Sequence, residues 1–359
     1  MKIVGVVVEY NPLHNGHVYH INKIKELARP DLIIAVMSSS FTMRGDLSIY
    51  DKFTKTKQAL NNDIDIVIDL PMVMSMQRAD IFAKNACTLL SMMNVDEIWI
   101  GSEENNYELY EKYYEKFNNE FEYNNDESYK KASSKVLPFL SNDLLGFSYY
   151  KAIKDNNLNI SLHTIKREKS NYLDDTPTDN HITSALSIRN NLNLLDIYTP
   201  SFVASNKNIL DENKLFNYIK YKILSSSLID LKSIFFVDEG IEYKLYDVKN
   251  FNDINSFVEY LSGKKYTKTR IKRMLIYILF NVTKSEINSI NDIDFVRVLG
   301  YSNNGKEYIN TIKHDIKIYT NIKEGISKVL DIEIKISKIL DIIFDTNLFM
   351  IEQKGPQIK

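Results

Sequence analysis

The chain has 359 residues and a formal net charge of −2, with 44% hydrophobic and 26% charged residues. This balance excludes a disordered chain and a membrane-embedded one, and the length favours two domains over one core. The near-cancellation of 45 basic by 47 acidic side chains gives no overall sign of a polyanion partner, and a single cysteine, Cys87, is typical of a cytoplasmic protein without internal disulfides.

Strand and helix patterns alternate through the first part of the chain. We expect strands at residues 3–8, 31–37, 65–70, 97–100 and 160–165, which are short runs rich in apolar and β-branched residues. We expect helices at residues 16–28, 51–61, 79–92 and about 184–191, and one more before the fifth strand. This α/β alternation predicts a Rossmann-like parallel sheet with helices on both faces, whose ligands bind beyond the carboxyl ends of the strands.

The second part of the chain has a different pattern. Residues 201–355 contain no proline, and apolar residues recur at helical spacing, as at Ile271, Leu275 and Ile278. We therefore expect two domains, an α/β domain at residues 1–195 and a mostly α-helical domain at residues 196–359. A few strand-like pieces, such as residues 234–237, interrupt the helical pattern.

The most informative segment connects the first expected strand to the first expected helix. It reads E-Y-N-P-L-H-N-G-H-V-Y-H from Glu9 to His20 and holds three of the six histidines. A helix N-terminus offers unpaired N–H groups and the positive end of a dipole, which together attract anions. Gly16 permits close approach of a phosphate, and His14 and His17 can donate hydrogen bonds as charge develops on it.

Two other interpretations of these histidines remain open. They can be ordinary packed or surface groups, or His14, His17 and His20 can hold a metal ion. The metal is disfavoured because no carboxylate stands at a persuasive ligand spacing, so no metal ligands are assigned. The chain contains no P-loop, dinucleotide-binding, zincin or serine-hydrolase motif, which disfavours those enzyme classes.

The four residues His14-Asn15-Gly16-His17 resemble the H-x-G-H signature of the nucleotidyltransferase superfamily, which includes adenylyltransferases and class I aminoacyl-tRNA synthetases. That superfamily pairs the signature with a late motif, I-S-S-T-x-I-R. Residues 182–189, I-T-S-A-L-S-I-R, stand in the corresponding place. The resemblance implies attack by a carboxylate or phosphate on the α-phosphate of a nucleoside triphosphate, with release of pyrophosphate.

A closer resemblance spans residues 3 to about 305 and is to the tRNA-Met cytidine acetate ligase family. It rests on the run V-V-E-Y-N-P at residues 7–12, on D-I-V-I-D-L-P at 65–71, A-D-I-F-A at 79–83 and G-S-E at 101–103, and on K-Y-T-K-T-R at 265–270 and V-R-V-L-G at 296–300. The resemblance implies that ATP activates acetate to acetyl-adenylate and that the acetyl group passes to N4 of the wobble cytidine of elongator tRNA-Met. The amine of cytosine is a poor nucleophile and acetate a poor electrophile, so a mixed anhydride kept from water makes chemical sense.

The resemblance also implies site residues. His14 and His17 are the expected catalytic residues, and Mg²⁺ is expected to assist. The expected ATP-binding residues are Val7, Val8, Glu9, Tyr10, Asn11, Pro12, Leu13, His14, Asn15, Gly16, His17, Val18, Tyr19, His20, Gly101, Asn142, Arg167, Ser187 and Arg189. The chain departs from the family pattern at Ser39, Ser40 and Met43, ahead of Arg44, and at Leu186, where a threonine is usual. Any hydroxyl contact to phosphate from the late motif must therefore come from Ser184 or Ser187.

The net charge conceals two blocks of opposite sign. Residues 103–127 hold nine acidic residues and two lysines, and residues 264–273 hold six basic residues and no acid. Basic side chains neutralise phosphates and aromatic rings stack on unpaired bases, although an ordinary solvated helix face would carry the same charges. The resemblance places the second block in a tRNA-binding half, with Lys264, Lys265, Tyr266, Lys268, Arg270, Lys272 and Arg273 as candidate RNA contacts. The acidic block is expected to keep RNA away from its side.

Two rival functions stay open at this point. A small-molecule adenylyltransferase would explain the histidines but would leave the helical half without a role. A non-catalytic tRNA-binding protein that retains the nucleotide fold would explain the helical half but not the intact pair of motifs.

Overall fold

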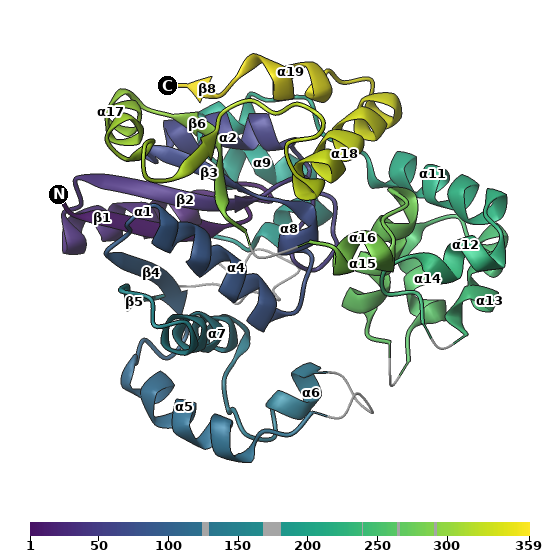
Figure 1. The fold of residues 1–359 in the computed structure, drawn as a ribbon, viewed down its shortest axis with the longest axis horizontal. Coiled ribbons are helices and arrows are strands. Elements are labelled where there is room, and N and C mark those ends of the chain that lie inside the picture. Colours follow the sequence, from purple (N-terminus) through teal and green to yellow (C-terminus); the bar gives the residue numbers. More distant parts are fainter. Residues whose placement is uncertain (124–128, 168–180, 239, 264–265, 291–292) are drawn as a thin grey trace.

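One mixed sheet lies at the centre of the molecule (Figure 1). The computed structural model describes residues 1–123, 129–167, 181–238, 240–263, 266–290 and 293–359. The strands follow the order β5-β4-β1-β2-β3-β6-β7, and β8 pairs with β6. Their bounds are β1 (Ile3–Val8), β2 (Leu32–Ser38), β3 (Ile66–Leu70), β4 (Glu97–Ser102), β5 (Ser161–Lys166), β6 (Phe295–Tyr301), β7 (Lys317–Tyr319) and β8 (Gln357–Ile358). The first five strands are parallel, which confirms the α/β prediction.

The helices predicted for the first half are present, and two further short ones, Met72–Ser75 and Tyr129–Ser133, have no counterpart in the prediction. Their bounds are α1 (Asn15–Ala28), α2 (Lys52–Asn61), α3 (Met72–Ser75), α4 (Ala79–Met92), α5 (Glu108–Glu120), α6 (Tyr129–Ser133), α7 (Ser141–Asp155) and α8 (Ala185–Asn190). Asp51 begins α2 by accepting hydrogen bonds from the N–H groups of Phe53 and Thr54, a typical N-cap. Helix α4 packs on β2 and β3, and α7 packs on α4 and β4.

A helical lobe lies beside the sheet, at the right of Figure 1. It contains α11 (Glu212–Ser225), α12 (Leu228–Ser233), α13 (Ile241–Leu245), α14 (Ile254–Leu261), α15 (Lys268–Leu279) and α16 (Lys284–Asn288), and it is reached through the short helices η1 (Leu192–Leu194), α9 (Leu195–Tyr198) and α10 (Ser201–Ala204). Helix α15 packs against α11 and α14 and buries Ile271, Met274, Leu275 and Ile278. The expectation of a strand at residues 234–237 is wrong, because only Ile234 forms a single bridge, to Thr283, directly after α12.

After the lobe the chain returns to the sheet. Strand β6 pairs antiparallel with β3, and β7 and β8 pair parallel with β6. Helices α17 (Asn303–Ile312), α18 (Lys328–Phe344) and α19 (Leu348–Lys354) complete the chain. The mostly helical interpretation of residues 196–359 thus missed three strands, and the division at residue 195 stays a prediction. No helix in the described parts of the chain is long and apolar enough to cross a membrane.

A buried cluster of charges fastens this returning segment to the first half. Lys52 of α2 is 1% exposed and its Nζ lies 3.0 Å from Glu333 of α18, 2.5 Å from Glu352 of α19 and 3.7 Å from Asp69 of β3. Glu352 also pairs with the buried Arg297 of β6. Burial alone would lower the pKa of Lys52, but the carboxylates of Glu352, Asp69 and Glu333 outweigh it and raise that pKa above its usual value.

We predict that Lys52→Met lowers the free energy of unfolding by about 3–5 kcal/mol, because it leaves three carboxylates buried with one cation. Urea denaturation measures the change. Lys25→Met is the matched control, since Lys25 forms an exposed ion pair with Asp63 whose loss costs about 0–1 kcal/mol. Equal effects of the two substitutions would contradict the assigned role of the cluster.

Candidate functional site

The first loop lies where the winding of the sheet reverses. Strand β1 pairs with β2 on one side and with β4 on the other, and the chain continues outward from each. The connection after β1 leads to β2 on one side, and the connection after β4 leads to β5 on the other. A crevice therefore forms between them at the carboxyl ends of β1 and β4, the usual place for a ligand in such a sheet. The loop after β1 enters this crevice and leads into α1.

His14 and His17 build the beginning of α1. His14 is the N-cap, and its Nδ1 accepts a hydrogen bond from the N–H of Gly16 at 3.0 Å. His17, three residues later, accepts the N–H of His14 on its own Nδ1 at 3.2 Å. This is a capping box made with imidazoles in place of the usual serine and glutamate. A Cβ at position 16 would lie 2.8 Å from the His14 ring, so glycine is required there.

The capping box fixes the tautomer of both rings. Because each Nδ1 accepts a hydrogen bond, a neutral imidazole carries its proton on Nε2. His14 and His17 therefore present two N–H donors, with their ring centroids 3.9 Å apart. The first turn of α1 contains no acidic residue, so the positive end of the helix dipole is left for a ligand.

The late motif meets the first loop, as the paired signatures predict. Arg189 of α8 donates from Nη1 to the carbonyl of Asn11 at 2.7 Å, and the Asn15 side chain donates to the carbonyl of His181 at 3.0 Å. Arg167 follows β5, and its side chain passes over Gly101 near the end of β4. A Cβ on residue 101 would lie 3.3 Å from the Arg167 side chain. Two guanidinium groups thus flank the two imidazoles.

These surroundings keep the histidines neutral. Burial, followed by the charges of Arg167 and Arg189, lowers the pKa of His14 to about 3. Burial and Arg167 lower the pKa of His20 to about 4, and burial with the neighbouring rings His14 and His20 holds the pKa of His17 well below its usual value. The arginines supply fixed positive charge, while the histidines supply directed N–H donors.

A cavity of about 870 Å³ extends from these groups, within the size range of ligand sites. It is lined by the predicted residues Val7, Val8, Glu9, Tyr10, Asn11, His14, Gly16, His17, Tyr19, His20, Gly101, Asn142, Arg167 and Arg189. Asn142 is held at the start of α7 by donating to the carboxylate of Glu103.

Five predicted residues do not line this cavity. Pro12, Leu13, Asn15 and Val18 belong to the loop and α1 but do not face it. Ser187 is 0% exposed, and its hydroxyl is enclosed within the protein. Ser184 lines the cavity and caps α8 by accepting the N–H of Ser187, so of the two serines only Ser184 is placed to reach a ligand.

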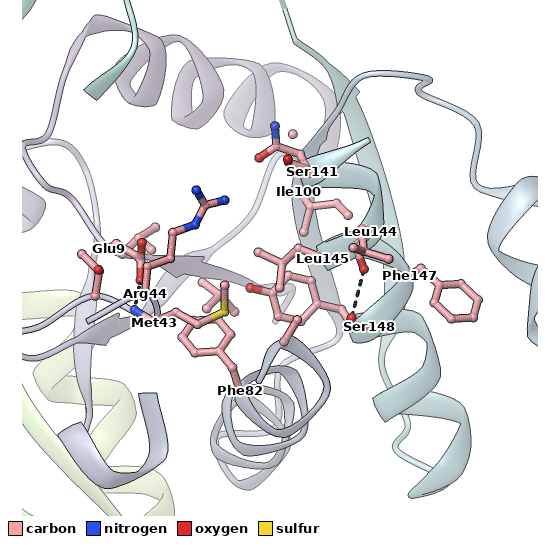
Figure 2. Close-up of a pocket in the computed structure, with 18 of the residues that line it drawn as sticks. Glu9, Met43, Arg44, Phe82, Ile100, Ser141, Leu144, Leu145, Phe147 and Ser148 are labelled. Carbon is pink, nitrogen blue, oxygen red and sulfur yellow. Dashed lines mark hydrogen bonds between the residues drawn. The ribbon is translucent and has the colours of Figure 1, made fainter. Parts of the chain in front are cut away.

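Sequence reasoning missed the part of the cavity formed by the loop after β2. Figure 2 shows Glu9, Met43 and Arg44 on one side of the cavity and Leu144 and Leu145 of α7 on the other. The backbone N–H of Met43 donates to Glu9 Oε1 at 2.6 Å. Burial raises the pKa of Glu9 against the opposing pull of that hydrogen bond and of nearby cations. Met43, a departure from the family pattern, therefore fixes Glu9 through its backbone.

A buried lysine joins the strand ends beneath this loop. Lys55 Nζ donates to the carbonyl of Glu9 at 3.0 Å, to the carbonyl of Ser38 at 2.8 Å and to Ser48 Oγ at 3.1 Å. It thus holds the segment after β1 against the end of β2. Ser39, another departure, is structural, because its Oγ donates to Asp69 at 2.5 Å, away from the cavity.

The basic block lies at the start of α15, and acidic residues partly neutralise it. Lys268 pairs with Glu259, Arg270 lies 3.5 Å from Asp238, and Lys272 lies 2.6 Å from Asp46. Arg270 also covers the Tyr266 ring at 4.4 Å. Arg273 is buried and lines the cavity. Lys264 and Lys265 lie outside the described residues, and RNA contact by this block stays a prediction.

The described residues include no group of three histidine, cysteine or acidic side chains placed to hold a metal ion.

The comparisons with known proteins agree with this geometry. The sequence model of the HIGH nucleotidyl transferase family matches residues 1–354. The tRNA(Met) cytidine acetate ligase of Staphylococcus aureus strain JH9 is 35% identical over 333 residues, which cover 87% of each chain. TmcAL of Thermotoga maritima without ligand superposes with a TM-score of 0.87 and 25% identity over 100% of this chain and 99% of that one. Its form bound with alpha-thio ATP gives 0.79 and 26% identity over 96% and 95%.

We predict that His14 and His20 of the free protein stay neutral from pH 8 down to about pH 5, because their pKa values are about 3 and 4. Imidazole NMR shifts, assigned with His14→Asn and His20→Asn, measure this. In urea the same histidines titrate near pH 6.5. The unfolded chain then binds more protons than the folded one between pH 6.5 and about 4, so folding loses stability as pH falls through that window. A midpoint above pH 6 for either ring in the folded protein would contradict the prediction.

Proposed function

The chain belongs to the tRNA(Met) cytidine acetate ligase family of HIGH nucleotidyl transferases, and from this we propose that it uses ATP to acetylate N4 of the wobble cytidine of elongator tRNA-Met. One observation carries the proposal. The two imidazoles, Arg167 and Arg189 converge on a cavity that continues to α15 of the helical lobe. A site for nucleotide chemistry and a path for a large acceptor are thus parts of one continuous cavity.

In the first step, an acetate oxygen attacks the α-phosphorus of ATP. A bond forms between that oxygen and phosphorus, the bond from phosphorus to the bridging oxygen breaks, and pyrophosphate leaves. The Nε2–H groups of His14 and His17 donate to phosphate oxygens as negative charge builds up, and the N-terminus of α1 faces the same charge. Arg167 and Arg189 bind the triphosphate, and a Mg²⁺ ion carried by ATP would neutralise part of its charge.

In the second step, cytosine N4 attacks the acetyl carbon. The bond to the AMP oxygen breaks, AMP leaves, and N4 loses one proton. The mixed anhydride is destroyed by water, so an enclosed cavity is a chemical requirement. We assign the helical lobe, α11 to α16, to holding tRNA against the opening of this cavity. A tRNA acceptor places the reaction in the cytoplasm.

We predict that His17→Gln lowers acetate-dependent exchange between pyrophosphate and ATP by roughly 100- to 1,000-fold, because it removes one donor to the transition state. Glutamine at this position can still close the capping box, and asparagine in His14→Asn can still cap α1, so both variants keep the helix intact. His314→Gln, an exposed histidine outside the cavity, is the matched control. Full exchange activity in both loop variants would exclude the assigned catalytic roles.

We also predict that the protein converts one cytidine of tRNA-Met to N4-acetylcytidine in the presence of ATP and acetate. Mass spectrometry of digested tRNA measures the product, and reactions without acetate or without ATP are the controls. Exchange activity without any acetylated nucleoside would instead indicate an adenylyltransferase for a small molecule. Tight tRNA binding without exchange would indicate a non-catalytic binding protein.

A further inference from the structure

Arg273 is a buried cation that the first step of the reaction leaves unused. It belongs to α15, is 7% exposed and lines the cavity. Its Nε and Nη1 atoms have no hydrogen-bond partner among the described residues. Buried donors without acceptors are costly, and a charged group more so, which points to a ligand that completes the site.

No described acidic residue forms an ion pair with Arg273; the charge of Asp80 acts on it more weakly than the cations Arg270 and Arg78 do. Arg270 and Arg78 are cations, and each already has an acidic partner: Arg78 lies 3.0 Å from Asp80, and Arg270 lies 3.5 Å from Asp238. Burial lowers the pKa of Arg273 to about 10, so the group is still charged at neutral pH. An acceptor for its N–H groups must come from outside the described residues.

An aromatic ring supports this guanidinium. The guanidinium lies over the Phe236 ring, 5.3 Å from the centroid, and Phe236 in turn contacts Tyr277 edge to face. Phe236 has a φ of 70°, a left-handed conformation that is unusual for an aromatic residue and that can be maintained where function requires it. The arginine is thus set for directional hydrogen bonds.

The loop after β2 fixes Arg273 relative to the first part of the site. Gly45 has a φ of 84°, and a Cβ there would lie 2.7 Å from the backbone nitrogen of Arg273. Lys272, the preceding residue, pairs with Asp46 at 2.6 Å. Met43 of the same loop donates to Glu9. The loop after β2 therefore contacts the backbone of Arg273 and also orients Glu9, which follows β1 and precedes the histidines.

We propose that Arg273 reads the acceptor base, donating two neighbouring N–H groups to N3 and O2 of a cytosine that has left its stack and entered the cavity. This inference rests on the proposed function. N3 and O2 are adjacent acceptors on the edge of cytosine that also carries N4, so the contact leaves N4 free for the acyl group. Uracil carries a hydrogen on N3, so its N3–H would face an N–H of Arg273, donor against donor. The same contact therefore rejects uracil.

The test compares two anticodon stem-loop RNAs that differ only in cytidine or uridine at the wobble position. The wild-type protein binds the cytidine loop about 5- to 150-fold more tightly, the range for one bidentate base contact. In Arg273→Met this ratio falls to about 1. Arg273→Lys keeps the charge without the planar fork and also loses most of the ratio. Misfolding would weaken both RNAs together and would leave their ratio unchanged.

Lys268→Met is the matched control on the same helix, because Lys268 pairs with Glu259 at the protein surface. It weakens both loops equally or not at all. A ratio near 1 in the wild type, or an unchanged ratio in Arg273→Met, overturns the proposal. Selective binding of the cytidine loop by a wild-type protein that never acetylates it would support base reading by Arg273 and refute the proposed reaction.

Discussion

The buried charge cluster around Lys52 is the constraint on which the rest of the molecule depends. It connects α2, which follows β2 in the chain, with α18, α19 and β6 near the end of the chain. The helical lobe therefore leaves the sheet after α10 and returns to it at β6, so both of its ends are anchored. This double attachment holds α15 against the loop after β2, where Gly45 meets the backbone of Arg273. The buried charges around Lys52 do not line the cavity, yet they help to hold the part of its wall that α15 contributes.

The sequence predicts well what local rules determine. The strands β1–β5 and the helices α1, α2, α4, α7 and α8 follow from short patterns, whereas α3 and α6 were not predicted. The approach of Arg189 to the loop that carries His14 and His17 follows from two motifs in order. Strand β6 was missed because its partner is β3, far away in the chain, and because the buried Arg297 makes its centre look exposed. Lys52, Glu333 and Glu352 likewise read as surface charges of amphipathic helices, and only their mutual proximity explains them. Ser187 shows the limit within a motif: its spacing is right, but α8 turns its hydroxyl into the protein.

Local charge, and not net charge, describes the electrostatics of this protein. The basic block of α15 is partly neutralised by Asp46, Asp238 and Glu259, so it is a weaker polyanion surface than its composition indicates. The cavity shows the opposite trend, because nine basic and four acidic residues among the described ones line it. Enclosure in a medium of low polarity strengthens this excess and concentrates its field. The excess of basic side chains therefore favours an anionic ligand in this cavity.

The site divides its work between fixed charge and directed hydrogen bonds. In the proposed reaction Arg167 and Arg189 bind the nucleotide, and their positive charges also help to lower the pKa of His14. A neutral imidazole with its proton on Nε2 adds no further positive charge to the resting site. It still offers an Nε2–H donor, whose direction is set by the capping hydrogen bonds at the start of α1. As negative charge develops on the α-phosphate, that donor gains strength without any rearrangement, which is the arrangement that favours a transition state over a ground state. In the proposed reaction, the two histidines that replace the serine and glutamate of an ordinary capping box would therefore both begin the helix and stabilise the transition state.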